Sequence, residues 1–331
     1  MFRWLSLILL VIVIGMGLVV GIRYWQKTPQ LMSPVVDKIL EKPLDKYTIE
    51  NLGKRAYQSR IFLDEAVATT SAYTAYIFHF DSDGKKVTGL AHLPTTCDKC
   101  PVIAQFRGYV DLEIYAPGVG TQRSARVFAG NGFISLAPDG LGYGGSDMPS
   151  ADVFEERFQS YTAALNLLAA IETWSKFNGH LFVWGHSNGG QVAISVLEIS
   201  QKSYPTALWA PVSKPFPYSI LYYTDEADDK GKALRKKLAR FEQDYDVDLY
   251  SLPNYLNRIT APLQIHQGTA DEAVPQKWSD ELVKLLSTMN HELITNYYVY
   301  PGADHNMTGA WNTVINRDIQ FYNNNLKSVV K

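Results

Sequence analysis

The chain has 331 residues, of which 46% are hydrophobic and 19% are charged. This composition is typical of a globular protein and excludes a disordered chain. The 31 basic and 33 acidic residues leave a net charge of −2, so no basic field would attract a nucleic acid and we expect no such partner. The two cysteines are too few for a disulfide scaffold.

The amino terminus carries an apolar stretch at residues 4–22 that contains no charged residue. It is about as long as the roughly 20 residues that a helix needs to cross a bilayer. No small-residue cleavage site precedes Arg23, so we predict that residues 1–27 form an uncleaved single-pass anchor whose partner is the lipid bilayer. Basic residues lie on both sides, at Arg3 and at Arg23 and Lys27, so charge does not decide the orientation.

The only two cysteines, Cys97 and Cys100, lie three positions apart in a loop bounded by prolines. A short disulfide there would persist in an oxidising compartment. We therefore expect a location at the cell membrane with the globular part outside the cytoplasm. A zinc half-site and a thioredoxin-like motif are weaker interpretations, because His92 is the only nearby additional ligand and no helix is expected after the first cysteine.

The remainder of the chain is predicted to form an α/β fold. Residues 28–71 are rich in proline and charge and are expected to be a tether and lead-in with one short helix, and the globular domain is expected at 72–331. Strand-length and helix-length segments then alternate, which predicts a mostly parallel sheet with helices on both faces. The expected strands are 72–80, 86–93, 102–106, 133–137, 180–184, 206–209, 263–266 and 293–300, and the expected helices are 121–131, 154–176, 188–200, 276–289 and 307–326.

The alternation is interrupted at about residues 211–258. An aromatic run that includes Tyr222 and Tyr223 is followed there by a charged helical stretch at 225–248. We interpret the segment as an inserted cap. Its tyrosines either line an apolar substrate pocket or pack the cap onto the core.

The sequence Gly185-His186-Ser187-Asn188-Gly189 lies between a strand of apolar residues and a helix. This is the G-x-S-x-G pattern in the strand–turn–helix context that holds a serine in a strained turn with its hydroxyl exposed. The pattern predicts that Ser187 is a nucleophile. The positive end of the following helix would favour an anion beside it.

A serine needs a base held by an acid, and in this fold order both follow the serine. Asp271 and His305 lie on successive loops, each expected after a strand, and are the candidate acid and base. His266 is the rival histidine, but it falls within a strand and is better explained as a core residue. Glu272 and Asp304 are the competing acids.

Acyl transfer also needs two backbone N–H groups to bind the oxyanion. Asn188 supplies the first, and Tyr109, or Val110 next to it, is the candidate for the second. Arg107 either binds a substrate anion or holds the loop through Asp111 or Glu113.

The segment at residues 137–147 is rich in glycine but lacks the spacing of a nucleotide-binding loop, so we expect it to shape the wall of a pocket. No metal-binding pattern is found, and we predict neither a metal nor a cofactor.

Together, G-H-S-N-G-G, A-P-D-G-L-G-Y-G-G-S-D and Q-G-T-A-D-E-A-V-P followed by P-G-A-D-H resemble the α/β-hydrolase superfamily, in particular the prolyl oligopeptidase-like catalytic domain and its esterase relatives. The resemblance covers residues 72–326 and implies that Ser187, Asp271 and His305 form a triad. Arg107 stands where the family commonly has a histidine. Prolyl oligopeptidases proper also carry a β-propeller, which we do not expect within this chain.

Three functions are therefore compared. The first is a membrane-anchored serine esterase that acts through an acyl-enzyme on a small-molecule ester. The second is a serine peptidase acting on short peptides, and the third is a catalytically silent binding module with the same fold. The sequence does not predict the oligomeric state.

Overall fold

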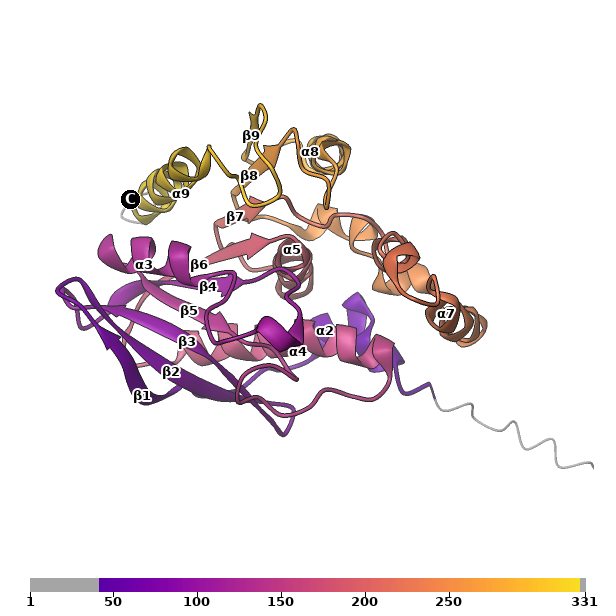
Figure 1. Cartoon of the computed structure of the whole chain (residues 1–331), viewed down its shortest axis with the longest axis horizontal. Coiled ribbons are helices and arrows are strands. Elements are labelled where there is room, and N and C mark those ends of the chain that lie inside the picture. The colour runs from indigo at the N-terminus through magenta and orange to yellow at the C-terminus, as the bar shows by residue number, and fades with distance from the viewer. Residues whose placement is uncertain (1–41, 328–331) are drawn as a thin grey trace, which may run out of the picture. The chain divides into compact units, whose positions relative to one another are not determined.

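A computed structural model describes residues 42–327 (Figure 1). It contains a nine-stranded sheet in the order β1-β2-β3-β5-β4-β6-β7-β8-β9. The first three strands and the β3–β5 pair are antiparallel, and the pairs from β5 to β9 are parallel. The strands are β1 Phe62–Thr69, β2 Tyr73–Ser82, β3 Lys85–Pro94, β4 Cys100–Phe106, β5 Ile134–Pro138, β6 Phe177–His186, β7 Thr206–Trp209, β8 Leu263–Gly268 and β9 Thr295–Tyr300.

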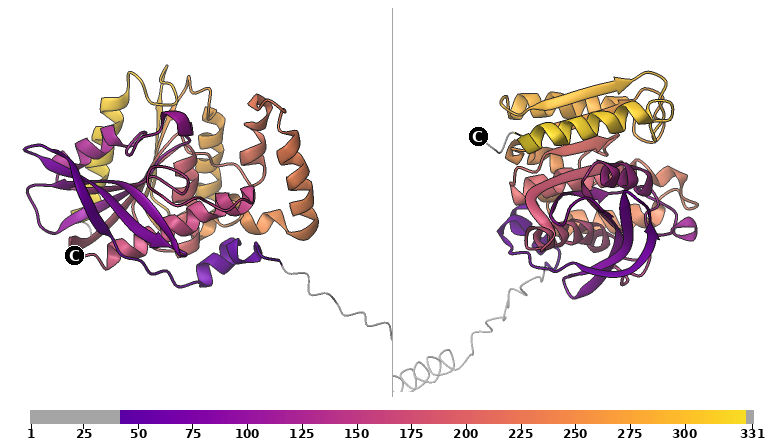
Figure 2. Two further views of the ribbon diagram at one scale, coloured as in Figure 1. Left: turned by 60° about the horizontal axis from the view of Figure 1, so that its bottom comes forward. Right: turned by 90° about the vertical axis from the view of Figure 1, so that its left-hand side faces the viewer.

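Helices cover both faces of the sheet, and each face has its own apolar core (Figures 1 and 2). Helices α3 and α9 lie on one face, where the ring of Phe128 contacts that of Tyr322 at 5.8 Å. Helices α4, α5 and α8 lie on the other. The helices are α2 Ile49–Lys54, α3 Gln122–Gly130, α4 Val153–Glu172, α5 Asn188–Ser200, α6 Tyr218–Leu221, α7 Lys232–Asp244, α8 Gln276–Met289 and α9 Trp311–Lys327.

The folded part begins before residue 72, where the sequence placed its start. Strand β1 pairs with β2 across two register shifts, and helix α2 packs against α5. Nearly every residue of β1 is exposed, so the strand carries no alternation of apolar and polar residues that would have revealed it. The compact unit extends back to Pro43.

The last helix also differs from the prediction, because it begins at Trp311 rather than Met307. Met307 has a φ of 59° and Gly309 a φ of 81°. Both values lie in the left-handed region, which a right-handed helix cannot contain. Residues 307–310 therefore belong to the loop that follows His305.

The segment at 211–258 joins β7 to β8 and consists of α6, α7 and four 3₁₀ turns. Its helix α7 packs through Phe241, whose ring lies 5.0 Å from that of Phe154 at the start of α4. The insertion thus lies against α4. The 3₁₀ turns are η3 Thr224–Glu226, η4 Val247–Tyr250, η5 Leu252–Asn254 and η6 Leu256–Arg258, and two more occur at η1 Asp45–Tyr47 and η2 Leu112–Ile114.

A buried polar network joins the ends of three strands to α9. The Asp318 carboxylate accepts hydrogen bonds from Trp209 Nε1 at 2.8 Å, Gln264 Nε2 at 2.8 Å and His266 Nε2 at 2.9 Å. His266 Nδ1 lies 2.7 Å from the Tyr300 hydroxyl. Within this network, these buried side-chain groups of Trp209, Gln264, His266 and Asp318 are all partnered, as a low-dielectric interior requires. The network therefore joins β7, β8 and β9 to α9 through side chains.

None of the helices in residues 42–327 is long and apolar enough to cross a membrane. The anchor predicted at residues 4–22 lies outside this range.

Candidate active site

Ser187 occupies a sharp turn between β6 and α5. Its φ of 56° and ψ of −122° are strained for a residue with a side chain. The turn depends on adjacent glycines: a Cβ at Gly189 would overlap the carbonyl of Phe106, and one at Gly190 would lie 2.6 Å from the Cβ of Pro211. Only hydrogen atoms fit at these points, which explains the glycines on the carboxyl side of the serine.

Asp271 and His305 are brought together from the loops after β8 and β9. His305 Nδ1 lies 2.9 Å from Asp271 Oδ2 and 3.0 Å from Oδ1. The same carboxylate accepts the N–H groups of Ala273 at 3.0 Å and Val274 at 2.8 Å. Asp271 is only 8% exposed. The carboxylate is thus fixed in position and holds the imidazole with its Nδ1 protonated, which leaves Nε2 to accept a proton.

His186, the residue before Ser187, contacts the loop of the base. Its Nε2 donates a hydrogen bond to the backbone oxygen of His305 at 2.9 Å, and the two rings are 4.6 Å apart. Burial, with a smaller contribution from nearby His305, lowers the pKa of His186 to about 4. His186 is therefore neutral near pH 7 and can hold the His305 loop without adding charge. The sequence placed this histidine within the turn but gave it no role.

The loop after β4 lies against the turn. A Cβ on Gly108 would lie 2.9 Å from the Cβ of Ser187, so only glycine permits this approach. The backbone N–H groups of Tyr109 and Asn188 have no acceptor within the described part of the chain. Both residues line the same cavity, whereas Val110, the other candidate donor, does not.

Arg107 is held by backbone carbonyls and aromatic rings. Its guanidinium donates to the carbonyls of Asp139 at 2.7 Å and Gly108 at 2.9 Å. It also lies 4.1 Å from the ring centre of Tyr143 and 4.6 Å from that of Tyr115. The prediction that Arg107 pairs with Asp111 or Glu113 was therefore wrong.

The contacts of Arg107 join the loop after β4 to the loop after β5. Arg107 therefore holds the Gly108 loop through the glycine-rich segment, which the sequence could not show because the two loops are more than thirty residues apart.

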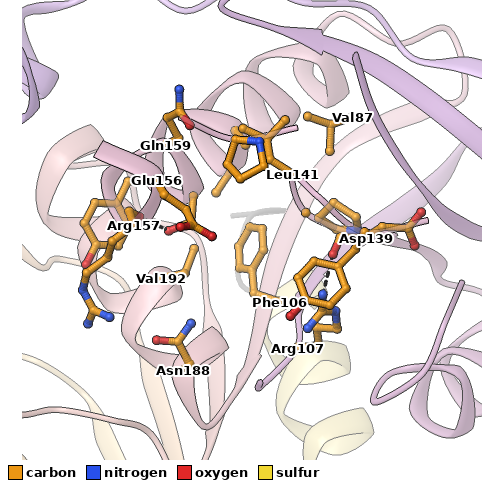
Figure 3. A pocket seen from close by; sticks show the side chains of 18 of the residues that line it. Val87, Phe106, Arg107, Asp139, Leu141, Glu156, Arg157, Gln159, Asn188 and Val192 are labelled. Carbon is orange, nitrogen blue, oxygen red and sulfur yellow. Dashed lines mark hydrogen bonds between the residues drawn. The ribbon is translucent and has the colours of Figure 1, made fainter. Parts of the chain in front are cut away.

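A cavity of about 290 Å³ opens beside Tyr109 and Asn188 (Figure 3). Its wall is built from β4, the glycine-rich loop after β5 and the first turns of α4. This confirms that the segment at 137–147 shapes a pocket wall. Apolar side chains of this lining include Val87, Phe106, Leu141 and Val192. Four charged side chains also line the cavity: Arg107, Asp139, Glu156 and Arg157.

Tyr222 and Tyr223, predicted as pocket residues, do not line this cavity. Tyr222 packs edge-on against Trp278 at 4.7 Å. The Tyr223 hydroxyl donates to the carbonyl of Ala273 at 3.0 Å, two residues after Asp271. Tyr222 therefore packs the insertion onto α8, and Tyr223 joins it to the loop that carries Asp271.

The rival acid and base are engaged elsewhere. His266 is fully buried in the network with Asp318. The Asp304 carboxylate accepts the N–H groups of Asn306 and Thr308 in its own loop, which lowers its pKa. Glu272 is exposed beside the Asp271 loop.

Cys97 and Cys100 are joined by a disulfide, with their Cα atoms 5.9 Å apart. No group of three or more acidic, histidine or cysteine side chains suited to a metal ion occurs among the described residues.

The sheet order, the strained serine turn and the paired loops define a serine hydrolase of the α/β-hydrolase fold. A model of the prolyl oligopeptidase family (Peptidase_S9) matches residues 121–329, which is more than half of the chain. The chain belongs to this family. A search of curated proteins found no match.

Solved structures show the same fold at low identity. Acetyl Xylan Esterase 1 from Thermoanaerobacterium sp. JW/SL YS485 is 16% identical with a TM-score of 0.62, over 85% of this chain and 94% of that one. A putative dipeptidyl aminopeptidase IV from Bacteroides ovatus is 13% identical with a TM-score of 0.59, over 77% of this chain and 36% of that one. Esterases and peptidases are thus both among the similar structures.

The lowered pKa of His186 predicts how the free energy of unfolding depends on pH. The pKa falls from 6.5 to about 4 on folding, so the unfolded chain binds an additional proton between these values. The free energy of unfolding is then fully maintained above pH 6.5 and decreases as the pH falls towards 4, by on the order of 3 kcal/mol from this group.

Urea denaturation of wild type and His186→Gln at several pH values measures the effect. We expect a smaller decrease in the variant, because glutamine does not titrate. Buried His92, whose pKa is also lowered to about 4, contributes equally in both proteins. The exposed control His291→Gln should behave as wild type, and identical pH profiles for wild type and His186→Gln would contradict the prediction.

Proposed function

We propose that this chain is a membrane-anchored serine esterase that cleaves small-molecule esters through an acyl-enzyme. The observation that carries the proposal is the hydrogen-bonded Asp271–His305 pair on loops beside the strained turn of Ser187. A catalytically silent module would not need a serine held at such a φ.

In the proposed reaction, the Ser187 hydroxyl attacks the ester carbonyl and His305 Nε2 takes its proton. Asp271 stabilises the imidazolium that forms. The N–H groups of Asn188 and Tyr109 bind the oxyanion. His305 then protonates the departing alcohol, and a water molecule activated by the same histidine releases the acid.

The cavity beside Tyr109 and Asn188 is the proposed acyl site, because the acyl carbon must lie where its oxygen reaches both N–H groups. The apolar part of its lining, which includes Phe106, Leu141 and Val192, favours an uncharged acyl chain. The second candidate, a peptidase, is favoured by the family to which the chain belongs. The two differ in the bond that is cleaved.

Labelling with a fluorophosphonate probe tests the nucleophile. We expect labelling of wild type and none of Ser187→Ala, and strong loss in His305→Ala and Asp271→Asn. In an ester assay, each variant should lower kcat by about 10⁴-fold, because these groups act as a unit.

The control is His291→Ala, which changes an exposed histidine away from the site. Retained labelling and turnover in both Ser187→Ala and His305→Ala would refute the mechanism. No labelling of a well-folded wild type would favour the silent module.

Matched substrates test the bond class. We expect kcat/KM to be at least about tenfold higher for p-nitrophenyl butyrate than for aminoacyl p-nitroanilides, because the apolar part of the cavity accommodates an uncharged acyl chain better than a charged amino group. Faster cleavage of aminoacyl anilides with one preferred residue before the bond would instead identify a peptidase.

The anchor and location are part of the same proposal. Residues 1–27 would hold the enzyme at the cell membrane as a single-pass anchor, with the catalytic domain outside the cytoplasm, where the Cys97–Cys100 disulfide is stable.

We expect the full chain to remain in alkali-washed membranes and a chain of residues 28–331 to be released. Protease added to intact cells should digest the catalytic domain. Full protection of the domain would instead indicate that it lies on the cytoplasmic side.

A further inference from the structure

A second cavity lies beside His186, the residue before Ser187. It has a volume of about 370 Å³ and is lined by residues of the loop before α3, the end of β6 and the loop after His305. His186 and Asn306, the sequence neighbours of Ser187 and His305, are among these residues. The first cavity is instead lined by Asn188, on the other side of the serine. In the chain, Ser187 therefore stands between a residue that lines the first cavity and a residue that lines the second.

Because of their positions, the two cavities would bind different parts of a substrate. The acyl oxygen must reach the N–H groups beside the first cavity, whereas the leaving group must receive its proton from His305. The second cavity borders the loop of that histidine. On the proposed mechanism it is the place for the leaving group.

The lining of the second cavity supplies hydrogen-bond donors and no carboxylate. Arg123, in the first turn of α3, lies 3.6 Å from the ring centre of Trp311, and its guanidinium has no hydrogen bond or ion pair with another residue in the range 42–327. Trp184 is only 2% exposed, and its Nε1–H is buried without an acceptor in the same range. An unpaired donor in a buried position is costly, so this N–H indicates a missing acceptor.

The amino-terminal end of helix α3 adds partial positive charge at this cavity. Helix α3 begins at this cavity, and its N-cap residue Thr121 makes no side-chain capping bond. The first N–H groups of a helix carry a partial positive charge that attracts anions. The nearest acid on the adjoining loop, Asp304, is turned towards the N–H groups of Asn306 and Thr308 and does not line the cavity.

We propose that this second cavity is a leaving-group subsite that binds a carboxylate on the alcohol part of the ester, chiefly through Arg123. Arginine binds carboxylates through two parallel hydrogen bonds, and the indole beneath it supports the guanidinium. The proposal rests on the proposed esterase function. In the reaction, the ester C–O bond breaks as Ser187 takes the acyl group, and the proton from His305 leaves with the carboxylate-bearing alcohol.

Two esters with the same acetyl group test the subsite. One is 4-acetoxybenzoate, whose leaving group carries a carboxylate, and the other is its neutral methyl ester. We expect Arg123→Gln to lower kcat/KM for 4-acetoxybenzoate about tenfold and to leave the methyl ester within twofold. The ratio kcat/KM is the quantity to compare, because it includes the acylation step in which the leaving group is still bound.

The matched control is Arg126→Gln, which changes an exposed arginine one turn further along α3 that does not line the cavity. It should leave both esters unchanged. Trp184→Phe keeps an aromatic ring but removes the N–H, and should lower kcat/KM for the charged ester more than for the neutral one. Equal effects of Arg123→Gln on both esters, or no effect on either, would overturn the proposal.

Calorimetric titration with 4-hydroxybenzoate separates this proposal from the proposed function, because it needs no turnover. We expect binding to wild type that weakens at high salt and is lost in Arg123→Gln. If the protein is not labelled by the fluorophosphonate and hydrolyses neither ester, the esterase function fails. In that case the titration still tests whether the second cavity binds a carboxylate. Binding that depends on Arg123 supports the carboxylate site, and equal or absent binding in both proteins refutes it.

Discussion

The close approach of β6, α5 and the loop after β4 is the constraint on which the site depends. The turn at Ser187 exists only because Gly189 and Gly190 let the helix lie against Phe106 and Pro211. Gly108 lets the neighbouring loop lie against the serine itself. Any Cβ at these points would push the loop and the turn apart. The strain at Ser187 is thus maintained by packing on both sides.

Polar contacts set the remaining loops relative to that turn. The network of Asp318 with Trp209, Gln264 and His266 joins β7 and β8 to α9. His186 then joins the turn directly to the backbone of His305. A neutral histidine suits this position, because a charged one beside His305 would oppose protonation of the base.

The two cavities near the turn differ in charge, because acidic side chains line only the cavity at Asn188. The cavity at Asn188 is lined by apolar and charged side chains from α4 and the glycine-rich loop, and Arg107 holds that loop through the carbonyl of Asp139. The cavity at His186 has Arg123 and the start of α3. An ester with an apolar acyl group and an anionic alcohol would match both. The insertion contributes through Tyr223, which contacts the Asp271 loop rather than a cavity.

The sequence by itself determined the alternating α/β pattern, the turn at Ser187 and the order of Asp271 and His305, because these depend on local periodicity, glycine spacing and chain order. It did not reveal β1, whose residues are exposed and lack alternation. It gave the wrong partners for Arg107 and did not decide whether Tyr222 and Tyr223 line a pocket or pack the insertion onto the core. The pairing of His186 with the His305 carbonyl and the two cavities were decided only by tertiary structure, because they join residues far apart in the chain, where sequence spacing gives no measure of distance.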